Sequence, residues 1–146
     1  MSASEPLRKR ALDGFWETVP SLWGFVRSHI RATATQKFDI TVEQFHVLRF
    51  VRRGMSMSEL AGARNISRPA ISQSVDMLVK KGLLNRTRST SDRRFVELTL
   101  THEGNALLDA VFTETRLWMS ERLRALSTEE LEAVITAMAA LKKMLD

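Results

Sequence analysis

Residues 67–86 read SRPAISQSVDMLVKKGLLNR, and this segment carries the clearest structural signal in the chain. Ser67 can cap a helix whose first turn holds Pro69, a position at which proline is tolerated. Gly82 can end the same helix, as glycine often does just after the last turn. Between these limits the apolar residues recur with helical spacing and form one buried stripe, which comprises Ile71, Val75, Leu78 and Val79.

Two shorter patterns precede this helix. Thr41 and Gln44 fit a capping box and predict a helix that ends near Gly54. Ser56 or Ser58 can cap a second, short helix, which stops at a break around Asn65 and Ile66. A short helix, a tight break and a helix of about four turns together indicate a helix-turn-helix, whose second helix lies in the major groove of DNA.

A strand-turn-strand pattern follows the second helix. Residues 83–88 are short and extended, turn formers occupy 89–92, and residues 95–101 alternate between apolar and polar side chains. A two-stranded hairpin is not stable alone and must pack on helices. The sequence therefore predicts a winged helix-turn-helix, a mainly α fold with a small β-hairpin wing.

The outward face of the second helix and the tip of the hairpin hold the candidate DNA contacts. Arg68 can reach guanine or phosphate, and Gln73 can form paired hydrogen bonds with adenine. Adjacent arginines on a turn can enter the minor groove, and Asp92 can hold one guanidinium in place, although such a surface pair can also contribute little. The predicted contacts are Ser67, Arg68, Pro69, Ser72 and Gln73 on the helix, Asp92, Arg93 and Arg94 on the wing, and Arg64, Arg86 and Arg88 on the DNA backbone.

The charge distribution agrees with a polyanionic partner. The chain carries a net charge of +5, but residues 49–94 hold eleven basic and three acidic residues and therefore a net charge of +8. A concentrated positive field suits a surface that releases counterions from phosphates, although the same charges also suit a solvated face.

Other classes of function find little support in the sequence. The chain has no cysteine, which removes disulfides, thiolate metal sites and thiol redox sensing. Its three histidines lack a metal-ligand spacing, and no catalytic motif is present, so we expect no metal, no cofactor and no enzymatic activity. We also expect no signal peptide and no membrane span, and hence a cytoplasmic protein.

Both ends of the chain show long amphipathic helical patterns. Pro20 interrupts the first of them and either kinks one helix or starts a second. Thr101 and Ser127 are the expected caps of the last two helices. The terminal stripes are too apolar to stay in contact with water, and we expect a second copy of the chain to bury them; they contain Trp16, Trp23, Trp118 and Met138.

The segments 67–86 and 92–104 closely resemble the MarR family (multiple antibiotic resistance regulators). In that family Asp-x-Arg marks the wing, and Leu-Thr-x-x-Gly marks the end of the hairpin and the start of the next helix. Here these motifs are formed by Asp92, Arg94, Leu100, Thr101 and Gly104.

The resemblance implies a single MarR-like domain over residues 1–146. Residues 5–38 and 102–146 would form dimerisation helices around a winged helix-turn-helix at 41–101. Ser72 and Gln73 fall where recognition-helix contacts are made in the family, and Arg94 falls where the wing arginine enters the minor groove. Glutamine at position 73 departs from the arginine that is most common there, so the resemblance implies DNA binding but does not fix the base preference.

The expected function is a homodimeric, sequence-specific transcription regulator, in this family most often a repressor. Its operator would be a pseudo-palindromic double-stranded DNA, since the winged helix-turn-helix regions of the two subunits would meet successive major grooves about 34 Å apart. The resemblance also implies a small aromatic effector, for which a pocket could involve Trp16, Trp23, His29 and Phe38, although core packing also explains these residues. The alternatives are a nonspecific or architectural nucleic-acid-binding protein, and a protein-interaction module that uses the winged head.

Overall fold

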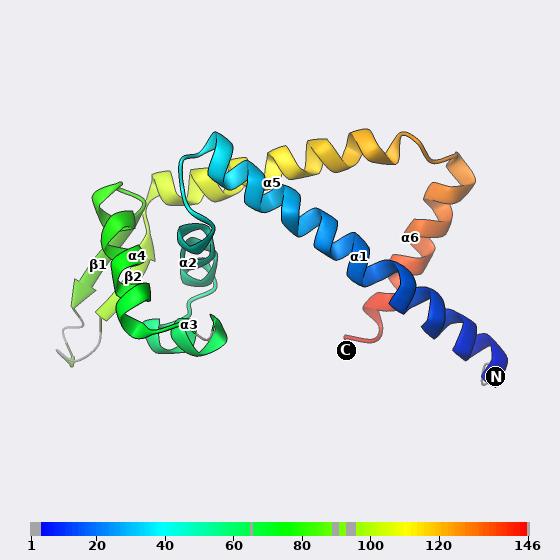
Figure 1. The fold of residues 1–146 in the computed structure, drawn as a ribbon, viewed down its shortest axis with the longest axis horizontal. Coiled ribbons are helices and arrows are strands. Elements are labelled where there is room, and N and C mark those ends of the chain that lie inside the picture. Colours follow the sequence, from blue (N-terminus) through cyan, green and yellow to red (C-terminus); the bar gives the residue numbers. More distant parts are fainter. Residues whose placement is uncertain (1–3, 65, 89–90, 93–95, 146) are drawn as a thin grey trace.

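The computed structural model describes residues 4–64, 66–88, 91–92 and 96–145 (Figure 1). In these ranges the elements are, in order, α1 (Glu5–Lys37), α2 (Val42–Arg52), α3 (Met57–Arg64), α4 (Arg68–Lys80), β1 (Leu84–Arg88), β2 (Val96–Leu100), α5 (His102–Leu123) and α6 (Thr128–Lys142). The chain forms a winged head, which comprises the elements from α2 to β2, joined to long helical arms, which comprise α1, α5 and α6. The fold class predicted from the sequence is confirmed.

The first helix runs without interruption through Pro20, so the proline lies inside α1 and does not start a second helix. α1 crosses α5, and the two helices contact each other beside the head (Figure 1). From there both extend away from the head, and α6 turns back from the far end of α5. Within the described ranges, none of the helices is long and apolar enough to span a bilayer.

Side-chain caps fix where the helices of the head begin. Thr41 and Gln44 form the predicted capping box of α2. Ser56, rather than Ser58, caps α3, because its Oγ accepts from the N–H of Glu59 while its own N–H donates to the Glu59 carboxylate. Each of these bonds satisfies a backbone N–H that has no partner within the helix.

The same kind of capping fixes the ends of α4 and the starts of α5 and α6. The Oγ of Ser67 accepts from the backbone N–H of Ala70 at the start of α4. Beyond the C-cap of that helix, Gly82 has a φ of +73°, a left-handed conformation that favours glycine. Thr101 caps α5, and Ser127 forms a capping box with Glu130 at the start of α6. All these caps confirm the sequence predictions.

The hairpin is antiparallel and somewhat shorter than predicted. Leu84 pairs with Leu100, Arg86 with Leu98, and Arg88 with Val96. The second strand was predicted over residues 95–101. Residue 95 lies outside the described residues, and the observed strand β2 ends at Leu100. The two members of a pair lie on the same face of a sheet, and every second residue along a strand lies on that face too. These three pairs therefore share one face. Leu84 is fully buried there, and that face therefore packs against the helices.

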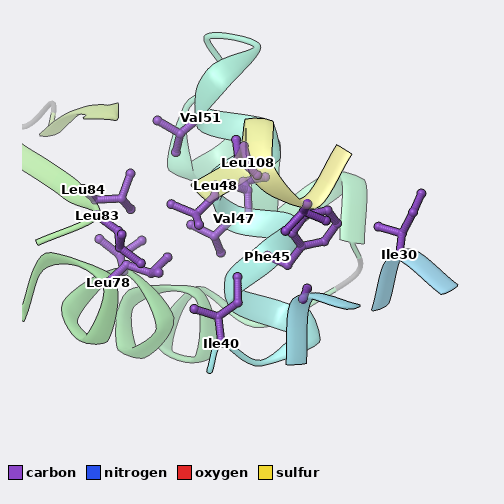
Figure 2. Close-up of a cluster of buried hydrophobic side chains, with 14 of the residues drawn as sticks. Ile30, Ile40, Phe45, Val47, Leu48, Val51, Leu78, Leu83, Leu84 and Leu108 are labelled. Atoms are coloured by element: carbon purple, nitrogen blue, oxygen red, sulfur yellow. The ribbon is translucent and has the colours of Figure 1, made fainter. Parts of the chain in front are cut away.

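The hydrophobic core lies in the head and extends to α1, which contributes Val26, Ile30 and Ala34. Phe45 and Leu48 of α2 occupy its centre, where side chains from α4, β1 and α5 surround them (Figure 2). α5 contributes Leu108 and Val111 to this core, so the head is completed by a helix that also forms part of the arms. By contrast, none of the residues of α6 is buried.

A tight contact joins the end of the hairpin to the start of α5. Thr101 donates its backbone N–H to the carbonyl of Leu83 over 3.2 Å and its hydroxyl to the carbonyl of Gly82 over 2.7 Å. The N–H of Gly104 in turn donates to the Thr101 hydroxyl. A Cβ atom at position 104 would lie 2.2 Å from the Leu83 carbonyl oxygen, so the backbones approach this closely only because residue 104 is glycine.

We therefore predict that Gly104→Ala destabilises the protein. The new methyl group must push away a backbone oxygen that cannot move freely, and overpacking of this kind costs about 1–3 kcal/mol. The free energy of unfolding, measured by urea denaturation at one fixed protein concentration, should fall by that amount.

Gly62→Ala is the matched control. Gly62 lies in α3, and nothing lies within 4 Å of the position that its Cβ would take. Alanine is about 1 kcal/mol more favourable than glycine inside a helix, so this variant should be slightly stabilised. An unfolding free energy for the Gly104 variant equal to that of the wild type would contradict the proposed close contact.

Candidate nucleic-acid interface

The start of α4 presents polar side chains on the side opposite its core stripe. Ile71, Val75 and Leu78 are buried against the head, whereas Val79, which was predicted in the same stripe, is exposed. The predicted contact residues lie on the remaining surface: Ser67, Arg68, Pro69 and Gln73 are exposed and Ser72 is half-buried. The structure thus gathers all five on the first two turns of one helix, where the free backbone N–H groups also favour an anion.

Arg68 is oriented by a residue that the sequence analysis did not select. Its Nη2 donates to the Oγ of Ser58 on the neighbouring helix α3. The sequence offers no signal for this bond, because it depends on how α3 and α4 pack. Beside it a cleft of about 500 Å³ separates α3 and α4 from the wing strand β2; it is lined by Ser56, Met57, Ser58, Arg68, Pro69, Ile71, Ser72 and Val96.

The hairpin lies beside α4 and is joined to it by an ion pair. Nη1 of Arg86 on β1 lies 2.7 Å from Oδ1 of Asp76 on α4. Asp76 stands one turn beyond Ser72, on the exposed surface of the helix. Arg86 was predicted as a DNA-backbone contact, and in the structure it forms an ion pair with Asp76 of α4. Arg88, the other predicted backbone contact on β1, is exposed.

The tip of the wing is described only in part. Asp92 is half-buried. The predicted wing arginines, Arg93 and Arg94, lie outside the described residues, and so does the side chain of Arg64. Their roles in DNA binding stay predictions from the sequence.

The four candidate effector residues are spread along α1. Trp16 and Trp23 are exposed on its outer half, at 66% and 52% of their surface, and Phe38 is half-buried where the helix ends. At 1.5 Å per residue, Trp16 and Phe38 are about 33 Å apart along the axis. One subunit therefore does not bring the four side chains into one cavity.

His29 belongs to an aromatic and charged cluster between α1 and α5. Its ring stacks on Trp118, with 4.0 Å between the ring centres and 6° between the ring planes, and its Nε2 lies 3.2 Å from the hydroxyl of Thr33. The guanidinium of Arg122 lies over the rings of both Trp118 and Phe25, 5.1 Å from the centre of the first and 4.9 Å from the centre of the second.

The charge state of His29 follows from this setting. Burial lowers the pKa of His29 below its ordinary value of 6.5, and the positive charges of Lys37 and Arg122 lower it further. The carboxylate of Glu114 opposes them, but Lys37 lies 2.5 Å from that carboxylate and offsets it. The neutral ring is therefore the form that suits the fold.

The head is similar to a known protein family. Residues 40–96 match the model of the MarR family, which confirms the resemblance found in the sequence. The match covers the helix-turn-helix and the hairpin as far as the start of β2.

Solved structures share the fold over almost the whole chain. Transcriptional regulator Tm0710 from Thermotoga maritima is 21% identical with a TM-score of 0.82, and the alignment covers 91% of this chain and 94% of that one. A mutant of MarR from E. coli is 26% identical with a TM-score of 0.66, over 87% and 96% of the two chains. A mutant of MepR from S. aureus bound to an oligodeoxyribonucleotide is 21% identical with a TM-score of 0.68, over 90% and 98%. The fold is thus that of MarR-family transcriptional regulators, which supports a DNA-binding regulator.

We predict that His29 makes the stability of the protein depend on pH. Because its pKa is lowered in the folded state, the unfolded chain binds more protons between that pKa and 6.5. The free energy of unfolding should therefore decrease as the pH falls from about 6.5 through the folded-state pKa. His29→Phe keeps an aromatic ring on Trp118 and should remove this part of the pH dependence, as urea denaturation at a series of pH values can show. Parallel pH profiles for the two proteins would contradict the assignment.

Proposed function

We propose that this chain, whose residues 40–96 match the MarR family, is a sequence-specific transcription regulator that binds double-stranded DNA as a homodimer. The observation that supports this most is the pairing of α4 with the wing: the exposed start of a helix and a hairpin lie side by side and are joined through Arg86 and Asp76. Both belong to the region with a net charge of +8.

In this proposal the helix reads bases while the flanking arginines bind phosphates and the minor groove. Gln73 forms paired bonds with adenine, and Arg68 contacts guanine or phosphate. Ser67, Ser72 and the first backbone amides of α4 hold phosphate. Arg93 and Arg94 enter the minor groove while Asp92 holds one of their guanidinium groups, and Arg64 and Arg88 bind the DNA backbone.

We propose that the arms, residues 5–38 and 102–146, form the dimer. Large apolar side chains remain uncovered on all three arm helices, among them Trp16, Leu117 and Ile135, which are 60–68% exposed. Stripes of this kind, on helices whose polar side faces water, mark an association surface. A twofold dimer buries the same stripe on both copies and places two heads on one side of a duplex.

We further propose that the protein is a repressor that a small aromatic compound releases from DNA. Trp16, Trp23, His29 and Phe38 remain the candidate contacts; since they are spread along α1, a pocket that uses all four would combine residues of both subunits. The compound must bind one spacing of the two heads better than the other, because otherwise it shifts nothing.

The test of the function is selection of DNA sites by the purified protein, followed by titration of the recovered duplex and of a scrambled duplex at the same salt concentration. We expect a pseudo-palindromic site that binds at least a thousandfold more tightly than scrambled DNA. Equal affinities would indicate a nonspecific binder, and no binding to either duplex would favour a module for protein interaction.

Two substitutions test the assigned roles in the same titration. Gln73→Ala should relax the preference at one base step in each half-site, at a cost of about 1–3 kcal/mol on the selected duplex. Arg94→Ala should weaken binding to most sequences alike. If Gln73→Ala leaves the order of preferred bases unchanged, the helix does not read DNA as proposed.

Assembly is tested by Ile135→Asp, which places a charge on the exposed stripe of α6. The variant should shift from dimer to monomer in sedimentation equilibrium, because a buried unpaired charge opposes association. Met77→Asp, at an exposed apolar position on α4, is the control and should remain dimeric. A wild-type mass of one subunit at micromolar concentration would contradict the proposal.

A further inference from the structure

We propose that Arg86 is a positioning residue that fixes the wing against the recognition helix through Asp76, whereas Arg88, on the same face of the same strand, binds DNA phosphate. This proposal rests on the DNA-binding function proposed above. It assigns different roles to two arginines that the sequence pattern does not distinguish.

The strand register places both arginines on one face of the hairpin. Arg86 pairs with Leu98 and Arg88 with Val96, and the next pair toward the helices is Leu84 with Leu100. Leu84 is buried on this face, so the base of the face packs on the head while the end near the tip is open. Arg86 thus lies where the hairpin still contacts α4, and Arg88 lies one step, about 6.6 Å, further out.

The partners of the two side chains differ accordingly. Arg86 lies 2.7 Å from Asp76, and only 33% of its side chain is exposed. Asp76 is the single acidic residue of α4, and its carboxylate would repel a phosphate if Arg86 were withdrawn from it. In the described part of the chain, no carboxylate lies within ion-pair distance of Arg88, which is exposed.

The direction of the strand brings Arg88 to the residues that are proposed to read DNA. β1 follows α4 after a short turn and runs back beside it (Figure 1). Ser72 lies one helical turn before Asp76, toward the start of α4, and Val96, the partner of Arg88, lines the same cleft as Ser72 and Arg68. Arg88 is therefore paired with a residue that lines this cleft together with Arg68 and Ser72 from the start of α4.

A partly exposed ion pair contributes little to the free energy of unfolding. Its consequence is geometric: it holds the wing at one position relative to α4, so that both can meet their grooves at once. A phosphate contact acts differently, because it strengthens binding to every sequence and adds to the salt dependence.

The test compares R86A with R88A, two variants with the same change in charge on the same strand face. The probes are the duplex recovered by site selection and a scrambled duplex of equal length and composition, each titrated at several salt concentrations. R88A should weaken both affinities alike and lower the slope of log K against log salt by about 0.9 for each phosphate that the variant no longer neutralises. R86A should reduce the ratio of selected to scrambled affinity about tenfold or more.

Asp76 supplies the second arm of the test. D76N should lower the same ratio as R86A does, and the double variant R86A/D76N should be no worse than either single one. The charge swap D76R/R86D keeps the net charge of the wild type and should restore most of the ratio that R86D loses. Thermal melts of all variants should lie close to that of the wild type.

The outcomes separate this proposal from the proposed function. If the wild type binds the selected duplex specifically but R86A and R88A weaken both duplexes alike, Arg86 is an ordinary phosphate contact and the positioning role is overturned. A D76N variant that keeps the wild-type ratio, or a charge swap as poor as R86D, overturns it as well. If the wild type itself does not prefer the selected duplex, the proposed function fails first.

Discussion

The close approach of Gly104 to the carbonyl of Leu83 is the constraint on which the geometry of the head depends. At this point the chain that leaves α4 and the chain that returns from β2 meet, and Thr101 binds the carbonyls of both Gly82 and Leu83. The hairpin is therefore held at its base on both strands, and α5 starts in a fixed direction from the same place. Because α5 also carries Leu108 into the core, the orientation of the arms follows from the contact that fixes the wing.

Polar contacts across neighbouring elements refine this arrangement. Arg68 is held by Ser58 between α4 and α3, and Arg86 by Asp76 between β1 and α4. A third pair joins α2 to α5, where Nη2 of Arg52 lies 2.6 Å from Oδ1 of Asp109. Each pair is exposed enough to add little stability, yet each joins two elements whose relative position matters for the proposed DNA-binding surface. The head thus has both a large positive charge and, at Arg52, Arg68 and Arg86, side chains whose positions are fixed by a partner on another element.

The sequence predicts those features of the fold that are local. The caps at Thr41, Ser67, Thr101 and Ser127 follow from hydrogen bonds within one turn, and the hairpin follows from alternation and turn formers. The outcome at Pro20 does not follow, because a helix tolerates a proline or ends at it according to what packs nearby. The pairs of Arg86 and Arg68 also escape sequence reasoning, since their partners lie 10 residues away along the chain and on other elements. The candidate effector residues came from the family resemblance, and the continuous helix α1 spreads them along its length instead of gathering them in one subunit.

Pro20 gives the arm a mechanical property. Proline has no N–H to donate, so the carbonyl of Trp16 lacks its usual partner within α1, and the helix is easier to bend there than elsewhere. The buried residues of α1 begin only at Val26. The fifteen residues of α1 before the proline therefore form a helical segment that is held within the subunit only at its carboxyl-terminal end, a lever in the mechanical sense. At 1.5 Å per residue this lever is about 22 Å long, and a bend of about 20° would move its tip by about 8 Å. In a single subunit, a small change of angle at this peptide would therefore displace the amino-terminal end of α1 much further than the buried residues from Val26 onward.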